Sequence, residues 1–227
     1  MLIDQRSDIL GLIDVQPTFM PGGELPVADG DTIIPIVNRL LTLFDHAFAT
    51  QDWHPANHAS FASQHPGRQP YDTIQMPYGD QVLWPDHGIA GSAPAAIHPA
   101  IDQTRIEAIV RKGFRPAIDS YSGFFENDRT TPTGLEAWLR QRGFSRLFLC
   151  GLATDFCVAW TAEDAVRIGF SVTVIEDACR PIALPIPDGR TTPDGRTTMD
   201  AARHRLTALG IRFIDSATLP FPLTQAL

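Results

Sequence analysis

The sequence predicts an α/β fold built on one mainly parallel sheet. Six mostly apolar runs of strand length alternate with stretches whose apolar residues recur at helical spacing. The runs do not alternate strictly between apolar and polar residues, which is typical of strands buried on both faces of a sheet. Strands that alternate with helices usually lie parallel and are joined by right-handed crossovers.

The predicted elements fill most of the chain. The strands are expected, first to sixth, at residues 8–14, 46–54, 106–112, 146–152, 171–177 and 211–215. The helices are expected at residues 33–44, 133–143, 155–169 and 199–210. Three of these helices end at a glycine, a common C-terminal signal. Because 227 residues with 44% hydrophobic content suffice for one sizeable core, we expect a single domain over residues 1–227.

Two segments interrupt the alternation. Residues 55–100 are rich in Pro, His and Gly, and an insertion of that length in a compact domain is usually functional or disordered. We interpret it as a loop that contributes to a metal and substrate site. Residues 187–198 repeat the hexamer PDGRTT in tandem, which favours a duplicated surface loop without a function of its own.

Composition excludes several classes of partner. The chain has 18 basic and 26 acidic side chains, a net charge of −8, which argues against nucleic acid and anionic membranes. The N-terminus lacks the charge pattern of a signal peptide, and no apolar stretch reaches the length of a membrane span. Three cysteines, an odd number, favour a reducing compartment, so we expect a cytoplasmic protein. A homo-oligomer is left open.

Lys112 is the only lysine, since the other 17 basic residues are arginines. A lysine ammonium is a compact charge whose pKa moves readily when buried, whereas arginine stays protonated. A chain that otherwise avoids lysine suggests that this position needs an ammonium. The alternatives are a solvated strand-end lysine and an accident of codon usage.

Reactive side chains follow four of the predicted strands. Asp14 ends the first strand, Asp52 and His54 end the second, Lys112 ends the third, and Cys157 follows the fourth. In open parallel sheets, ligands bind outside the carboxyl ends of the strands. We therefore expect an acid, a metal-ligand pair, a lysine and a thiol to meet at one edge.

Cys157 is the candidate nucleophile. A helix N-terminus or a nearby cation lowers the pKa of a thiol, and backbone N–H groups of residues 151–154 would form an oxyanion hole. The alternative, a small buried hydrophobe, fits Cys150 better, and Cys179 is intermediate.

Asp14 and Lys112 would complete the reactive group. Asp14 is either a turn former or the base that takes the thiol proton and returns it to a leaving amine. Lys112 would hold Asp14 in place and stabilise the thiolate. This arrangement differs from a Cys–His pair because its base is a carboxylate.

Asp52 and His54 are candidate metal ligands, because residues i and i+2 of a strand point to the same face. His87, within the long insertion, supplies a third ligand. One carboxylate and two imidazoles suit zinc, with iron or manganese as alternatives. His58 is a weaker candidate, and a D-x-H triplet in general often binds no metal. His65 and His98 are interpreted as loop residues.

Several motifs in register resemble one family. They are IDVQ with Phe19, QDWHPANH, LWPDH, VRKG, DSYSGF and GLATDFCV, in order from about Ile9 to about Asp215. Together they resemble the motifs of bacterial and yeast-type nicotinamidases in the isochorismatase-like hydrolase superfamily. The metal motif distinguishes these from relatives without a metal.

The resemblance implies a Rossmann-like, three-layer fold, with helices on both faces of a six-stranded sheet in the order 3-2-1-4-5-6. It assigns the catalytic triad to Asp14, Lys112 and Cys157 and the metal ligands to Asp52, His54 and His87. It also implies a cis peptide between Leu152 and Ala153, an oxyanion hole of the Ala153 and Cys157 amides, and a ring pocket lined by Phe19, Trp84 and Tyr121. Gly88 departs from the family, whose members often have cysteine after the third metal ligand.

The implied activity is metal-dependent hydrolysis of nicotinamide in NAD salvage, with pyrazinamide as a further substrate. One alternative is a superfamily amidase acting on a carbamoyl or ureido substrate with the same triad and no metal. A nucleotide-binding oxidoreductase is disfavoured because no strand–helix turn carries GxGxxG. A non-catalytic metal or redox sensor would leave Asp14 and Lys112 unexplained.

Overall fold

The computed structural model describes residues 2–186 and 196–219. Its main sheet has six strands, each parallel to its neighbours, in the order β5-β2-β1-β6-β7-β8. The strands are β1 (Asp8–Ile13), β2 (Ala47–Asp52), β5 (Ala108–Lys112), β6 (Arg146–Leu152), β7 (Ser171–Arg180) and β8 (Arg212–Ile214). These are the six predicted strands, so the predicted order 3-2-1-4-5-6 is confirmed.

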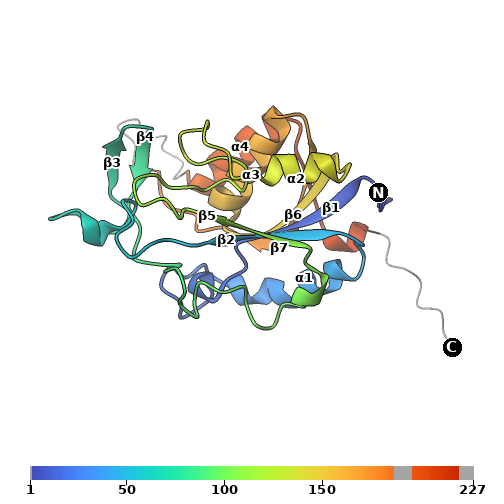
Figure 1. Cartoon of the computed structure of the whole chain (residues 1–227), viewed down its shortest axis with the longest axis horizontal. Coiled ribbons are helices and arrows are strands. Elements are labelled where there is room, and N and C mark those ends of the chain that lie inside the picture. Colours follow the sequence, from blue (N-terminus) through green and yellow to red (C-terminus); the bar gives the residue numbers. More distant parts are fainter. Residues whose placement is uncertain (1, 187–195, 220–227) are drawn as a thin grey trace.

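Helices cover both faces of this sheet, which confirms the predicted class of fold. The helices are α1 (Ile34–Leu41), α2 (Leu135–Gln141), α3 (Ala159–Arg167) and α4 (Thr198–Ala208). In Figure 1, α1 lies on one face and the other three lie on the opposite face. The central strands β1 and β2 are buried along their whole length, as their apolar runs predict.

Some predicted boundaries are wrong. The second strand ends at Asp52 rather than at residue 54, and β7 continues to Arg180. The helix predicted at 155–169 begins as a π-helical turn, Thr154–Val158, before α3. The edge strand β5 alternates between half-buried and exposed residues from Ala108 to Arg111, so one of its faces is open to solvent.

The long insertion is not a structureless loop. It contains an antiparallel hairpin of β3 (Thr73–Met76) and β4 (Gly79–Val82), which lies apart from the main sheet in Figure 1. Four-residue strands are too short for a clear periodic signal, which is why the sequence did not predict them. Most of the PDGRTT repeat, residues 187–195, lies outside the described residues.

Among the described residues, no helix has the length and apolar character needed to span a membrane.

Gly151 gives the most direct test of this sheet. It lies opposite Ile13 with φ +123°, and a Cβ placed on it would stand 2.0 Å from the Ile13 carbonyl oxygen. Gly151→Ala should therefore lower the free energy of unfolding by at least about 3 kcal/mol.

Gly143→Ala is the matched control, because it also has positive φ (+82°) but no atom within 4 Å of an added Cβ. It should cost only about 1–2 kcal/mol, from backbone strain alone. Urea denaturation measures both variants, and equal losses would contradict the close approach of β1 and β6.

Candidate active site

Asp14 stands directly after β1, in a left-handed backbone conformation with φ 48°. Its side chain is fully buried, and Thr50 on β2 donates a hydrogen bond of 2.6 Å to its Oδ1. Burial raises the pKa of Asp14, opposed by the Lys112 ammonium. A buried carboxylate of raised pKa is suited to accept and return a proton.

The Lys112 ammonium is the centre of the site. Its Nζ lies 2.8 Å from Asp14 Oδ2 and 3.4 Å from Cys157 Sγ, and donates to the Ser120 carbonyl oxygen at 2.9 Å. It also forms an ion pair with Asp52, its partner in the pairing of β2 and β5. The structure therefore brings Asp14, Lys112 and Cys157 together, while the contacts with Asp52 and Ser120 were not foreseen from the sequence.

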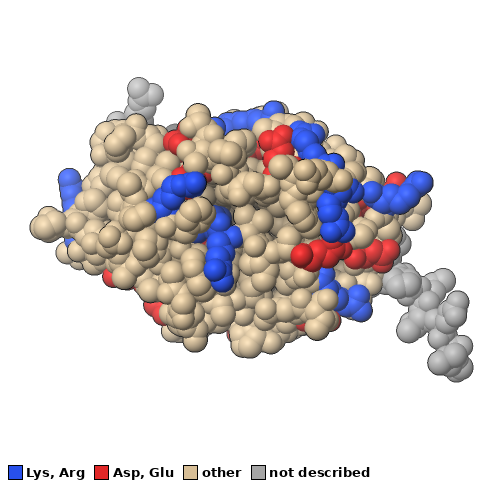
Figure 2. All heavy atoms as spheres, in the orientation of Figure 1, with Lys and Arg blue, Asp and Glu red and all other residues tan. Residues whose placement is uncertain are grey.

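Burial separates this lysine from the other cations. The Lys112 side chain is 0% exposed, so the basic side chains on the face drawn in Figure 2 are arginines. Burial by itself would lower the pKa of Lys112, but Asp14 and Asp52 together hold it well above its usual value. The ammonium therefore stays charged because two carboxylates surround it.

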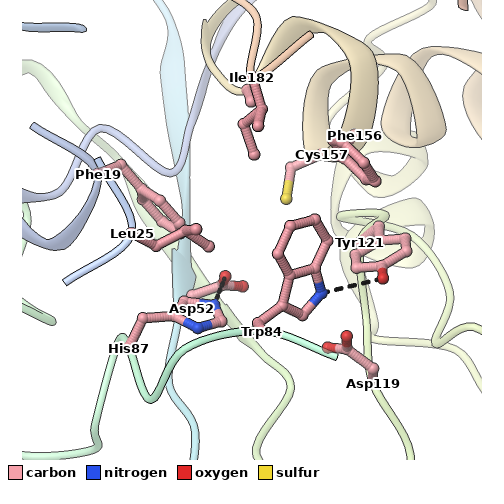
Figure 3. A pocket seen from close by; sticks show the side chains of 11 residues that line it. Phe19, Leu25, Asp52, Trp84, His87, Asp119, Tyr121, Phe156, Cys157 and Ile182 are labelled. Carbon is pink, nitrogen blue, oxygen red and sulfur yellow. Dashed lines mark hydrogen bonds and ion pairs between the residues drawn. The ribbon is translucent and has the colours of Figure 1, made fainter. Parts of the chain in front are cut away.

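Cys157 lies in the π-helical turn Thr154–Val158, and its side chain faces a pocket (Figure 3). The sequence suggested that its pKa would be lowered by the helix end or a cation. The structure has the opposite direction, because burial raises the pKa of the thiol well above its usual value and outweighs the nearby ammonium. A thiol that keeps its proton needs a base, and the acceptor atoms of Asp14, Asp52 and Cys157 lie within 4.8 Å of one another.

The backbone before Cys157 is unusual. The peptide bond between Leu152 and Ala153 is cis, and Ala153 lines the pocket. The Ala153 carbonyl oxygen accepts hydrogen bonds from the N–H groups of Phe156 and Val158, at 3.2 and 3.1 Å. The turn is thereby anchored beside the thiol.

A second cluster joins Asp52, His54 and His87, whose ligand atoms lie within 4.8 Å of one another. Asp52 Oδ2 is 3.5 Å from His54 Nε2 and 3.6 Å from His87 Nε2. The Nδ1 atoms contact backbone carbonyls, of Gly113 at 2.9 Å and of Pro85 at 2.8 Å. Since a carbonyl only accepts, each Nδ1 donates its proton to that carbonyl, and each Nε2 is the nitrogen that faces Asp52.

These three side chains fit a divalent metal ion. Two imidazoles oriented by backbone carbonyls and one carboxylate form a common ligand set, with positions left for water or substrate. Glycine at position 113 allows the His54 ring to lie against the backbone there, since a Cβ on Gly113 would lie 2.3 Å from that ring. Asp52 belongs both to this cluster and to the ion pair with Lys112.

His58 is the weaker candidate for this ion. Its Nδ1 contacts Ser60 Oγ at 2.7 Å and its Nε2 contacts the Ile118 carbonyl at 3.2 Å, so both nitrogens already have partners. Its nitrogens do group with His54 and Asp119 within 4.8 Å. Within the described residues, His65 and His98 belong to no such cluster.

A pocket lies between the two clusters, lined by Asp52 and His87 of one and by Cys157 of the other. The three side chains expected to line it, those of Phe19, Trp84 and Tyr121, do so (Figure 3). The sequence did not identify four further lining residues, Leu25, Asp119, Phe156 and Ile182. Asp119 stands within the DSYSGF motif, but a lone aspartate there gave no signal of its own.

Gly88 follows the third candidate ligand in a left-handed conformation, with φ +54°. Its N–H donates to Thr18 Oγ1 at 3.1 Å, and its carbonyl accepts from the His54 N–H at 2.9 Å. A Cβ at this position would lie 3.3 Å from the Asp52 Cβ. Glycine therefore leaves Asp52 room beside the histidines.

The fold agrees with comparisons to known proteins. The family model described as the isochorismatase domain matches residues 8–184, most of the chain. The chain belongs to the isochorismatase family.

Two relatives with high sequence identity are nicotinamidases. The nicotinamidase of Acinetobacter baylyi is 56% identical over 171 residues, which cover 75% of this chain and 80% of that protein. The nicotinamidase of Escherichia coli is 44% identical over 181 residues, covering 78% and 84%.

Solved structures of the family superpose well on this chain. That of Acinetobacter baumanii nicotinamidase pyrazinamidease has a TM-score of 0.87 at 48% identity, covering 93% of this chain and 97% of that one. PnC1 from L. infantum in complex with nicotinate gives 0.80 at 34%, covering 97% and 98%. Pyrazinamidase of Pyrococcus horikoshii in complex with zinc gives 0.71 at 31%, covering 92% and 99%.

The contacts of Lys112 predict that arginine cannot replace it. A guanidinium is larger than an ammonium and would not fit between Asp14, Asp52 and Cys157. Lys112→Arg should therefore lower the free energy of unfolding by about 3 kcal/mol or more, as for a broken buried ion pair.

The control is the exchange at the neighbouring position. Arg111 is exposed and stacks on Trp53 at 3.9 Å, so Arg111→Lys should cost no more than about 1 kcal/mol. Urea denaturation of both variants measures the difference, and a fully stable Lys112→Arg protein would contradict the buried contacts.

Proposed function

We propose that this chain is a single hydrolase domain over residues 1–227 that converts nicotinamide to nicotinate and ammonia, a step of NAD salvage. The observation that carries the proposal is the position of Lys112. Its ammonium contacts Asp14 and Cys157 on one side and the candidate metal ligand Asp52 on the other. Asp52 and Cys157 both line the pocket with aromatic walls. The names of the relatives and the nicotinate in one related structure support it. Pyrazinamide, also a flat heteroaromatic amide, is the proposed second substrate.

The first step forms a thioester. Asp14 takes the proton of the Cys157 thiol, and Sγ bonds to the carboxamide carbon while the C=O electron pair moves to oxygen. The backbone amides of Ala153 and Cys157 are the proposed donors to that oxyanion. Asp14 then gives its proton to the nitrogen as the C–N bond breaks, and ammonia leaves.

The second step restores the enzyme. Asp14 takes a proton from water, whose oxygen bonds to the thioester carbon, and the C–S bond breaks. The sulfur regains that proton, and the product leaves as nicotinic acid, which loses its remaining carboxyl proton to solvent as nicotinate. Throughout, the Lys112 ammonium offsets the negative charge that moves between Asp14 and Cys157.

Asp52, His54 and His87 would hold one divalent ion, for which we propose zinc, with iron or manganese as alternatives. The ion would supply a Lewis-acid contact for the pyridine nitrogen and so orient the ring. The zinc in the related pyrazinamidase structure supports this assignment. The pocket walls of Phe19, Trp84 and Tyr121 suit a flat ring.

Replacing the thiol tests the covalent mechanism. Cys157→Ala should lower ammonia release from nicotinamide by about 10⁴-fold or more, because the chemistry has no other nucleophile. Cys150→Ala is the control, since Cys150 is buried within β6 and should leave turnover intact. A coupled ammonia assay measures both variants.

Retained turnover in Cys157→Ala would contradict the thioester. Release of ammonia from a carbamoyl or ureido amide, but not from nicotinamide, would instead favour the metal-independent amidase.

A further inference from the structure

The hairpin β3–β4 sends one side chain into the protein. Of its residues Thr73–Val82, only Gln81 is buried, with 0% of its surface exposed. A fully buried amide must have hydrogen-bond partners, so the environment of Gln81 shows what the hairpin holds in place.

Both ends of the Gln81 amide are engaged. Its Nε2 lies 2.7 Å from the Val82 carbonyl oxygen, 2.8 Å from Asp119 Oδ2 and 3.0 Å from the Tyr121 hydroxyl, so its two N–H groups serve three acceptors. Its Oε1 accepts from the Tyr78 hydroxyl and from Asn127 Nδ2, both at 3.2 Å. Because a carboxylate only accepts, the nitrogen must face Asp119, and this orientation leaves the carbonyl facing two donors.

Two of these partners form a wall of the pocket. Asp119 and Tyr121 both line it, on the side of Trp84 in Figure 3. The Tyr121 hydroxyl also accepts a hydrogen bond from Trp84 Nε1 at 3.0 Å. Gln81 therefore connects Asp119 with Tyr121 and, through the Tyr121 hydroxyl, with Trp84, and all three line the pocket.

The Asp119 carboxylate is buried, so it needs the hydrogen bond from the Gln81 amide that water would supply to an exposed acid. It is 2% exposed, and within residues 2–186 and 196–219 its carboxylate pairs with no lysine or arginine. Its donors are Gln81 Nε2 and the Ser120 N–H, at 2.8 Å each. Without Gln81, one buried oxygen would lose its donor, and the side chain would leave its present position.

We propose that Gln81 is a positioning residue for substrate binding, which fixes Asp119 and Tyr121 against the ring of a bound heteroaromatic amide. This role rests on the proposed function. None of the described hydrogen bonds of Gln81 reaches Asp14, Lys112 or Cys157. Its loss should therefore weaken binding and leave the chemical steps largely intact.

The test replaces the amide with an apolar chain of similar length. Gln81→Met should raise KM for nicotinamide about tenfold, the effect of one lost hydrogen bond to a charged group, with kcat changed less than about threefold. Gln75→Met is the matched control, an exposed glutamine of the same hairpin, and should leave both constants unchanged. Tyr78→Phe removes only one donor to Gln81 and should raise KM about two- to threefold.

The assays are run on metal-loaded protein at a temperature well below the unfolding midpoint of each variant. An unchanged KM in folded Gln81→Met overturns the inference, and so does a fall in kcat at constant KM. If Gln81→Met does not fold, Tyr78→Phe takes its place as the test. A rise in KM of about two- to threefold supports the inference, and an unchanged KM overturns it. If the unsubstituted protein releases no ammonia from nicotinamide, the proposed function fails first, and this outcome is distinct from an unchanged KM.

Discussion

The site depends on one buried ammonium. Lys112 Nζ contacts Asp14, Asp52, Cys157 and the Ser120 carbonyl oxygen, and all of these side chains are buried. The two carboxylates need a cation to remain charged in such surroundings, and the cation needs them in turn. These ion pairs hold both Asp14, beside Cys157, and Asp52, in the candidate metal cluster, in position.

Asp52 makes the two clusters one unit. One of its oxygens pairs with Lys112, and the other faces the Nε2 atoms of His54 and His87. The Lys112 ammonium and His54 hold the pKa of Asp52 well below its usual value, although burial opposes this. Asp52 is therefore a carboxylate at neutral pH, which is the form that a metal ion requires.

The sequence predicted which residues would meet, because the carboxyl ends of parallel strands share an edge. Asp14, Asp52 and Lys112 follow from that rule alone. It could not predict that Lys112 pairs with Asp52, since the register of the two paired strands decides which side chains touch. It also could not predict the direction of the Cys157 pKa, which depends on burial by distant segments. Gln81 escaped notice because a lone glutamine in a short hairpin has no pattern.

Ammonia release from nicotinamide, before and after metal removal, tests the account most directly. The metal-loaded protein should release ammonia. After chelation and dialysis the rate of release should be at least about 100-fold lower, and added zinc should restore it. Elemental analysis confirms the removal, and thermal unfolding confirms that the chelated protein is still folded. Undiminished release from a metal-free, folded protein, or no release from the metal-loaded one, would contradict a reaction that needs both clusters.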